Sequence, residues 1–175
     1  MQTFLIDTCI WSYRFSEKRK EHANVIERVQ ELAPDSILGI SIITWGEVVY
    51  GHKAVRRDKR IQAEYLQFII SKGPKMFYVD DRHTATAYGE LRASLFEKYA
   101  PKDKRRPNTR PEQLIDPVTS SELGIQENDL WIAAQAIVKN LTLVTDDKLS
   151  RIREVAGADL HTENWAKSPD TPTTS

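Results

Sequence analysis

Runs of apolar and β-branched residues, nearly uninterrupted by polar ones, recur along the chain at residues 3–8, 37–44, 76–81 and 141–147. Such runs indicate strands that are covered on both faces, as in a parallel sheet. Residues 158–165 form a weaker candidate for a fifth strand, at the edge of the sheet. The pattern therefore predicts a sheet of four or five short strands.

Between these runs, apolar residues recur at helical spacing, which predicts helices over residues 21–32, 47–70, 81–99 and 129–139. Pro34 ends the first of them, and the long second pattern is expected to be two helices that break near Arg57 and Asp58. Strands that alternate with helices predict an α/β fold, a three-layer α/β/α domain with a mainly parallel central sheet.

Polar segments set the expected domain boundaries. A chain of 175 residues can bury the core of one domain, which we expect over residues 1–166. Residues 101–121 carry four prolines and many charges, which predicts a loop insertion. The segment 167–175 is short, polar and proline-containing, which is typical of a disordered tail.

Composition narrows the class of protein. Lys and Arg total 25 and Asp and Glu total 25, so bulk charge provides no attraction to nucleic acid or membrane. Cys9 is the single cysteine, which excludes an intrachain disulfide and favours a reducing compartment. The most apolar window, residues 37–45, is too short to span a bilayer, and the amino terminus lacks a signal-peptide pattern. We therefore expect a cytoplasmic protein without a membrane partner.

Acidic residues follow the predicted strands. Asp7 ends the first strand, Glu47 follows the second, and Asp146 and Asp147 end the fourth, while Asp129 opens the helix that leads into the fourth. Ligands of an open parallel sheet bind beyond the carboxyl ends of its strands, so these acids can converge there. Carboxylates at close range repel one another, and a divalent cation relieves that repulsion. Oxygen-only ligands favour Mg²⁺ or Mn²⁺.

Each acid also has a local explanation. Asp7 can cap a helix over residues 9–13, and Glu47 can favour the start of a helix dipole. Asp129 can be an N-cap, and Asp146 and Asp147 can be turn residues. The residues alone leave these alternatives open.

Three segments in order carry a family resemblance: LIDTCIWS, ISIITWGEVVYG and NDLWIAAQAIVKNLTLVTDDKL. Together they resemble a PIN domain and, within that superfamily, the VapC-like toxins of bacterial toxin–antitoxin pairs. The resemblance spans about residues 2–165. Residues 101–121 are longer than the family's usual link before its third acid. Because Asp146 and Asp147 are adjacent, the residue that matches the family's fourth acid is ambiguous. Asp147 is favoured because the family usually carries this acid at the second position after the threonine, here Thr145, and Asp146 is the alternative.

The resemblance implies a Mg²⁺- or Mn²⁺-dependent endoribonuclease, the toxin of such a pair, which hydrolyses RNA phosphodiesters with a metal-activated water. The metal ligands and catalytic acids that it implies are Asp7, Glu47, Asp129 and Asp147, with Asp146 as the alternative to Asp147. Thr8 and Thr145 would support these carboxylates or act only in strand-end turns. The implied partners are RNA, a small antitoxin protein and a second copy of the chain in a homodimer.

A neutral chain needs local basic groups to hold RNA phosphates. Arg14 and, in the insertion, Lys104, Arg105 and Arg106 are the favoured candidates, although each can also belong to a solvated face. Nearby aromatic residues could stack on bases, but core packing is the more common use of such residues. The candidates are Trp11, Tyr13, Trp45 and Tyr50.

Two other function classes fit part of the pattern. An aspartate-nucleophile phosphatase would use Asp7 itself to attack phosphorus, but Asp7-Thr8-Cys9 lacks the second acid of that class's D-x-D motif. A PIN-like module that binds RNA or protein without cutting is the other, and the presence of an acid at all four family positions argues against it.

Overall fold

The structure is a computed structural model, and it describes residues 1–54, 58–100, 109–116 and 118–168. They fall into two compact units. The sheet unit comprises Met1–Tyr78, Leu141–Asp147 and the chain from Thr162 onward, and the helical unit comprises Val79–Asn140 and Lys148–His161. That residues 1–166 form one domain stays a prediction.

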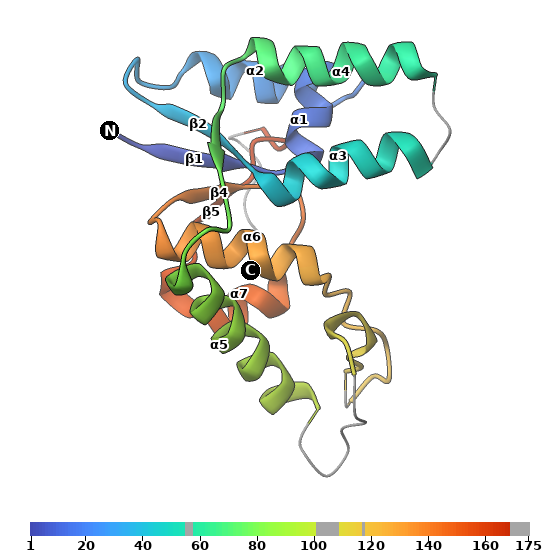
Figure 1. Cartoon of the computed structure of the whole chain (residues 1–175), viewed down its shortest axis with the longest axis vertical. Coiled ribbons are helices and arrows are strands. Elements are labelled where there is room, and N and C mark those ends of the chain that lie inside the picture. Colours follow the sequence, from blue (N-terminus) through green and yellow to red (C-terminus); the bar gives the residue numbers. More distant parts are fainter. Residues whose placement is uncertain (55–57, 101–108, 117, 169–175) are drawn as a thin grey trace. The chain divides into compact units, whose positions relative to one another are not determined.

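The sheet unit is built on five parallel strands: β1 (Thr3–Ile6), β2 (Ile37–Ser41), β3 (Lys75–Phe77), β4 (Thr142–Val144) and β5 (Thr162–Glu163). Their order is β3-β2-β1-β4-β5, so the first strand is central and β5 is an edge strand (Figure 1). Every neighbouring pair is parallel. The predicted α/β fold with a mainly parallel sheet is confirmed.

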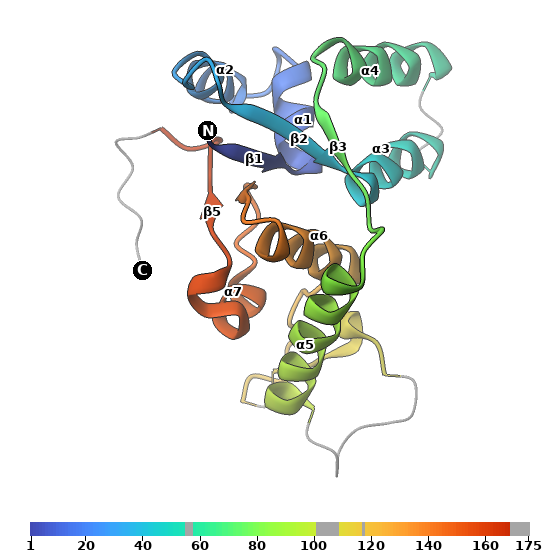
Figure 2. The same cartoon turned by 60° about the vertical axis from the view of Figure 1, so that its left-hand side comes forward.

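Four helices of the sheet unit lie on one face of the sheet (Figures 1 and 2). They are α1 (Thr8–Phe15), α2 (His22–Gln30), α3 (Ile42–Ala54) and α4 (Lys59–Ser71). Between these helices and the sheet lies a core that includes Phe4, Trp11 and Trp165, each at most 2% exposed. Phe4 and Trp165 meet edge to face, with ring centroids 5.1 Å apart. This packing fixes β1 and α1, and therefore the loop between them.

The boundary between β2 and α3 differs from the prediction. The apolar run was expected to continue as strand to residue 44, but the strand ends at Ser41. The Ser41 hydroxyl oxygen accepts a hydrogen bond of 3.0 Å from the Ile43 backbone N–H, which caps the helix there. Glu47 consequently lies in the second turn of α3 rather than at its start.

The helical unit contains α5 (Arg82–Tyr99), α6 (Glu127–Val138) and α7 (Ser150–Ala156), with the short 3-10 helices η1 (Pro111–Gln113) and η2 (Gly157–Asp159). The long helix α5 packs against both α6 and α7. The described part of the predicted insertion contains η1 and an antiparallel bridge between Ile115 and Glu122, so this part is ordered structure rather than plain loop. Within the described residues, no helix is long and apolar enough to cross a membrane.

Candidate metal centre

Asp7 stands where β1 passes into α1. Its backbone N–H continues the ladder by donating to the Val144 carbonyl at 3.0 Å, and its Oδ1 accepts from the Thr8 N–H at 2.7 Å. Asp7 is therefore the N-cap of α1, as the local explanation proposed. Its second oxygen, Oδ2, accepts from the Thr145 hydroxyl at 2.7 Å. A cap needs only one oxygen, so the second is directed at the end of β4.

The end of β4 brings a second acid to Asp7. The Thr145 hydroxyl donates to Asp7 and accepts from the Asp147 N–H at 3.1 Å, which ties the turn after β4 to the end of β1. In the described part of the chain, Asp7, Cys9 and Asp147 each present one possible ligand atom, and these atoms all lie within 4.8 Å of one another. Two acids from strands far apart in sequence thus meet at one edge of the sheet.

Glu47 connects to the same edge through Thr8. The Thr8 hydroxyl donates to Glu47 Oε2 at 2.6 Å, so α1 and α3 are joined next to the Asp7 cap. The charge of Glu47 also raises the pKa of Asp7, as does that of Asp147. Thr8 and Thr145 are therefore hydroxyl donors to Glu47 and Asp7 respectively.

Burial and like charge make Asp7 an unfavourable anion without a counter-ion. Burial is the largest cause that raises its pKa above the ordinary 3.8, and the hydrogen bonds from Thr145 and Thr8 oppose it. Asp7 is only 9% exposed. A divalent cation beside Asp7, Glu47 and Asp147 would stabilise the charged forms, and carboxylate oxygens suit a hard ion. The residues present thus fit a magnesium- or manganese-type ion.

Cys9 lies beside the carboxylates as a neutral thiol. Its Sγ is 3.7 Å from both Asp7 Oδ2 and Thr145 Oγ1. Burial, and then the charge of Asp7, raise the pKa of the Cys9 thiol to about 12. In the metal-free protein the thiol is therefore protonated, and the charged donors beside it are carboxylate oxygens, which a hard cation prefers.

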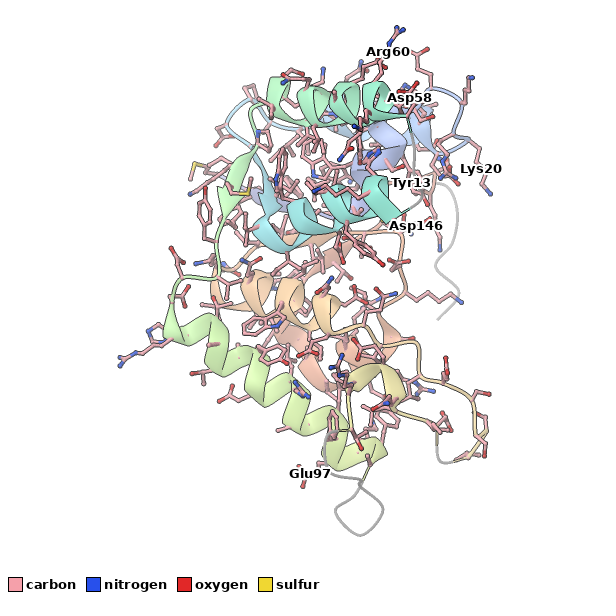
Figure 3. All side chains as sticks on the ribbon, turned by 45° about the vertical axis from the view of Figure 1, so that its right-hand side comes forward. Tyr13, Lys20, Asp58, Arg60, Glu97 and Asp146 are labelled. Atoms are coloured by element: carbon pink, nitrogen blue, oxygen red, sulfur yellow. The ribbon has the colours of Figure 1, made fainter. Side chains whose placement is uncertain are left out.

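Asp146 is directed away from this group, although it is the neighbour of Asp147. Its Oδ2 accepts from the Tyr13 hydroxyl at 3.0 Å, and its Oδ1 accepts from Asn164 Nδ2 at 2.8 Å. Figure 3 shows Tyr13 and Asp146 next to each other. This contact was not predicted, because Tyr13 and Asn164 lie 133 and 18 residues from Asp146 along the chain and no local pattern pairs them. Of the two acids, Asp147 is the one grouped with Asp7.

A pocket of about 280 Å³ borders Asp146. It is lined by Lys20, Glu21, Asn24, Asp146, Ala166 and Lys167. Lys20 and Asp146 can be found in Figure 3. The Asp146 side chain therefore faces this pocket and its two neutral donors.

Asp129 belongs to the helical unit. It is the third residue of α6, whose N-cap is Gln126, so the explanation of Asp129 as an N-cap is wrong. The first turn of α6 is held from outside: Glu112 of η1 accepts from the Glu127 N–H at 2.9 Å, and Arg92 of α5 pairs with the Glu127 carboxylate at 3.0 Å. The role of Asp129 as a ligand stays a prediction.

The basic candidates are only partly described. Arg14 is half-buried, its guanidinium lies over the Trp11 ring at 5.5 Å, and burial lowers its pKa. Lys104, Arg105 and Arg106 lie outside the described residues. Among the aromatic candidates, Trp11 is a core residue and Tyr50 is 73% exposed.

Comparison with known proteins places the chain among related sequences and structures. A family model described as PIN domain matches residues 4–158. Ribonuclease VapC2 of Rickettsia felis is 27% identical over 165 residues, which cover 94% of this chain and 98% of the relative.

Two solved structures share the fold. One is VapBC2 from Rickettsia felis bound to a DNA fragment from their promoter, with a TM-score of 0.64, 24% identity, and coverage of 94% of this chain and 99% of the other. The other is VapBC-1 from nontypeable Haemophilus influenzae, with a TM-score of 0.63, 22% identity, and coverage of 95% and 100%.

Proposed function

The chain belongs to the PIN-domain family, and from this premise we propose that it is a metal-dependent endoribonuclease, the toxin of a toxin–antitoxin pair. The observation that carries the proposal is the meeting of Asp7 and Asp147, held together by the Thr145 hydroxyl, with Glu47 joined to them through Thr8. The similarity to a protein named Ribonuclease VapC2 supports RNA as the substrate.

The proposed cofactor is Mg²⁺ or Mn²⁺, held by Asp7, Glu47 and Asp147. Asp129 is included as a fourth ligand because the family pattern has an acid there. When bound, such an ion would lower the pKa of a water and neutralise charge that develops on a phosphodiester. The protein's own contribution is to orient these acids: Thr145 holds one oxygen of Asp7, and Thr8 holds one oxygen of Glu47.

The proposed partners follow the family resemblance. A small antitoxin protein would bind and restrain the nuclease, and the similarity to two VapBC structures supports such a partner. A homodimer and a cytoplasmic location, where the RNA substrate would be, complete the proposal. Arg14 and the basic residues 104–106 are the proposed phosphate contacts.

The test is cleavage of RNA by the purified chain, free of antitoxin. We expect cleavage with Mn²⁺ or Mg²⁺, none with EDTA, and a loss of about 100-fold or more in Asp7→Asn and Glu47→Gln, because each substitution removes a ligand charge. Equal cleavage by Asp7→Asn and wild type would refute the site.

The same experiment decides between the function classes. Intact RNA after incubation of well-folded protein with Mn²⁺ would favour a binding module that does not cut. A phosphoenzyme trapped on Asp7 would favour the phosphatase. Asp7 is nearly buried, with both oxygens hydrogen-bonded, which disfavours direct attack on phosphorus.

A further inference from the structure

Asp146 is an anchored carboxylate beside the candidate metal centre. Both of its oxygens are engaged, one by the Tyr13 hydroxyl from α1 and the other by the Asn164 amide just after β5. Asn164 is itself held, because its Oδ1 accepts from the Ala166 N–H at 2.9 Å. The two donors approach from different elements, so the Asp146 side chain cannot rotate without losing a hydrogen bond.

The anchor fixes the turn that carries Asp147. Within this turn, the Asp146 N–H donates to Cys9 Sγ at 3.4 Å, and the Thr145 N–H donates to the Glu163 carbonyl at 3.0 Å. Each of these contacts links the turn to α1 or β5, the elements that also supply Tyr13 and Asn164. The position of the backbone at Asp146 therefore determines where the Asp147 side chain starts.

Asp147 depends on this support more than Asp7 does. Asp7 is buried and its carboxylate is held by Thr8 and Thr145, whereas Asp147 is exposed. Among the described residues, no recorded hydrogen bond holds the Asp147 carboxylate itself; only its backbone N–H is bound, by Thr145. An exposed carboxylate on a short turn keeps a defined distance to Asp7 only if the turn is rigid.

We propose that Tyr13 and Asn164 are positioning residues that act through Asp146 to hold Asp147 against Asp7. This inference rests on the proposed function, because it assigns the anchor a role in that same metal centre. It also gives the two adjacent acids different tasks: Asp147 faces the ion, and Asp146 fixes the turn.

The test is Tyr13→Phe, which removes one hydroxyl and leaves the ring. We expect kcat for RNA cleavage to fall by about tenfold with KM little changed, because a small displacement of a ligand impairs the reaction more than substrate binding. Mn²⁺ affinity, measured by electron paramagnetic resonance on the same protein, should weaken several-fold. The matched control is Tyr78→Phe, since Tyr78 is 54% exposed.

A second variant and a double mutant keep the inference falsifiable. Asn164→Asp keeps the acceptor for the Ala166 N–H, but it loses the donor to Asp146 and sets a second carboxylate beside it. It should therefore lower kcat and Mn²⁺ affinity at least as much as Tyr13→Phe. In Asp146→Ala, adding Tyr13→Phe should cause no further loss, because both act through one contact. Additive losses would overturn the inference.

The outcomes separate the inference from the proposed function. If wild type cleaves RNA and Tyr13→Phe matches it in both kcat and Mn²⁺ affinity, the positioning role is wrong while the nuclease stands. If wild type does not cleave, the proposed function fails, and the Mn²⁺ affinities of wild type and Tyr13→Phe still decide whether the anchor positions Asp147.

Discussion

Asp146 and Asp147, two adjacent residues after β4, differ in side-chain direction, and this difference decides which of them lies beside Asp7. One possible ligand atom of Asp147 lies within 4.8 Å of those of Asp7 and Cys9. The Asp146 carboxylate instead accepts hydrogen bonds from Tyr13 and Asn164. The sequence left the choice between these acids open. Their positions distinguish them: a carboxylate oxygen of Asp147 lies within 4.8 Å of a carboxylate oxygen of Asp7, whereas both oxygens of Asp146 accept hydrogen bonds from residues outside that group.

The two acids should therefore respond differently to the same substitution. We expect Asp147→Asn to lower the rate of RNA cleavage by about 100-fold or more, since a ligand charge is lost. Asp146→Asn should lower it by only about tenfold, since only the support of the turn is weakened. The measurement is single-turnover cleavage at saturating Mn²⁺. The reverse order of effects would assign the ion to Asp146.

Asp7 makes the metal-free protein sensitive to pH. Its folded-state pKa lies above the ordinary 3.8 because of burial and neighbouring acids. A carboxyl group shifted in this direction contributes stability that is complete below the unfolded pKa and is lost as pH rises through the folded pKa. The charged form at neutral pH is thus a source of instability unless a cation is bound.

We accordingly expect Asp7→Asn to raise the melting temperature of the metal-free protein at pH 7. The difference should shrink as the pH falls toward the ordinary carboxyl pKa of 3.8, because the raised pKa lets Asp7 of the folded wild type take up its proton above that pH. Thermal unfolding in EDTA across this range measures it, with the exposed Asp159→Asn as control. A wild type more stable than Asp7→Asn at pH 7 would contradict the burial argument.

At the scale of elements, the sequence predicted where strands and helices lie better than where they end. The apolar runs located four strands, because strands of a parallel sheet are covered on both faces, and the weaker candidate at 158–165 contains β5. The run at 76–81 overestimated β3, which ends at Phe77. The run through residue 44 was overextended because strand and helix can both use Ile42 and Ile43, and only the Ser41 cap decides between them. The short helix α7 was not predicted. Its N-cap, Leu149, has a φ of 45° and makes no side-chain cap hydrogen bond, so no capping residue marks its start in the sequence.

The candidate site was predictable to the same degree. Asp7, Glu47 and the pair Asp146 and Asp147 were expected near one another because they follow strands whose carboxyl ends share an edge, while the family resemblance alone favoured Asp147 over Asp146. The roles of Tyr13 and Asn164 could not be predicted, because their partner Asp146 lies 133 and 18 residues away and no local pattern marks the contact. Long-range side-chain hydrogen bonds are a property of the fold.

The start of α6 gives a prediction at this scale. Gln126 makes no side-chain cap bond, and Glu112 of η1 accepts from the Glu127 N–H instead. Glu112→Ala should therefore lower stability by about 0.5–1 kcal/mol, similar to the loss of an N-cap. Glu112→Gln keeps the acceptor and should lose less. Thermal unfolding measures both, and Glu97→Ala, at an exposed position of α5, is the control (Figure 3).

An unchanged melting temperature in Glu112→Ala would mean that water replaces the carboxylate at no cost. A fall matching that of Glu97→Ala would mean that charge alone, and no specific bond, explains it. Only a larger fall in Glu112→Ala, restored in Glu112→Gln, supports the cap.

On the scale of the whole molecule, the charge balance conceals a local imbalance. The chain has no formal net charge, yet Asp7, Glu47 and Asp147 gather three negative charges at one edge of the sheet unit. An RNA phosphate that approaches this edge without a cation meets repulsion at close range, where salt screens least. The metal site should therefore control RNA binding as well as cleavage.

We expect wild type to bind RNA weakly in EDTA, and the triple variant Asp7→Asn, Glu47→Gln, Asp147→Asn to bind at least about threefold more tightly at low salt. Fluorescence anisotropy of a labelled RNA measures both. A control with the same change of net charge replaces three exposed acids of the sheet unit by their amides, namely Glu27, Glu31 and Asp35. If net charge governs binding, both variants gain equally. If the acid group repels the substrate locally, only the site variant gains, because a charge beyond a Debye length from the phosphate contributes little.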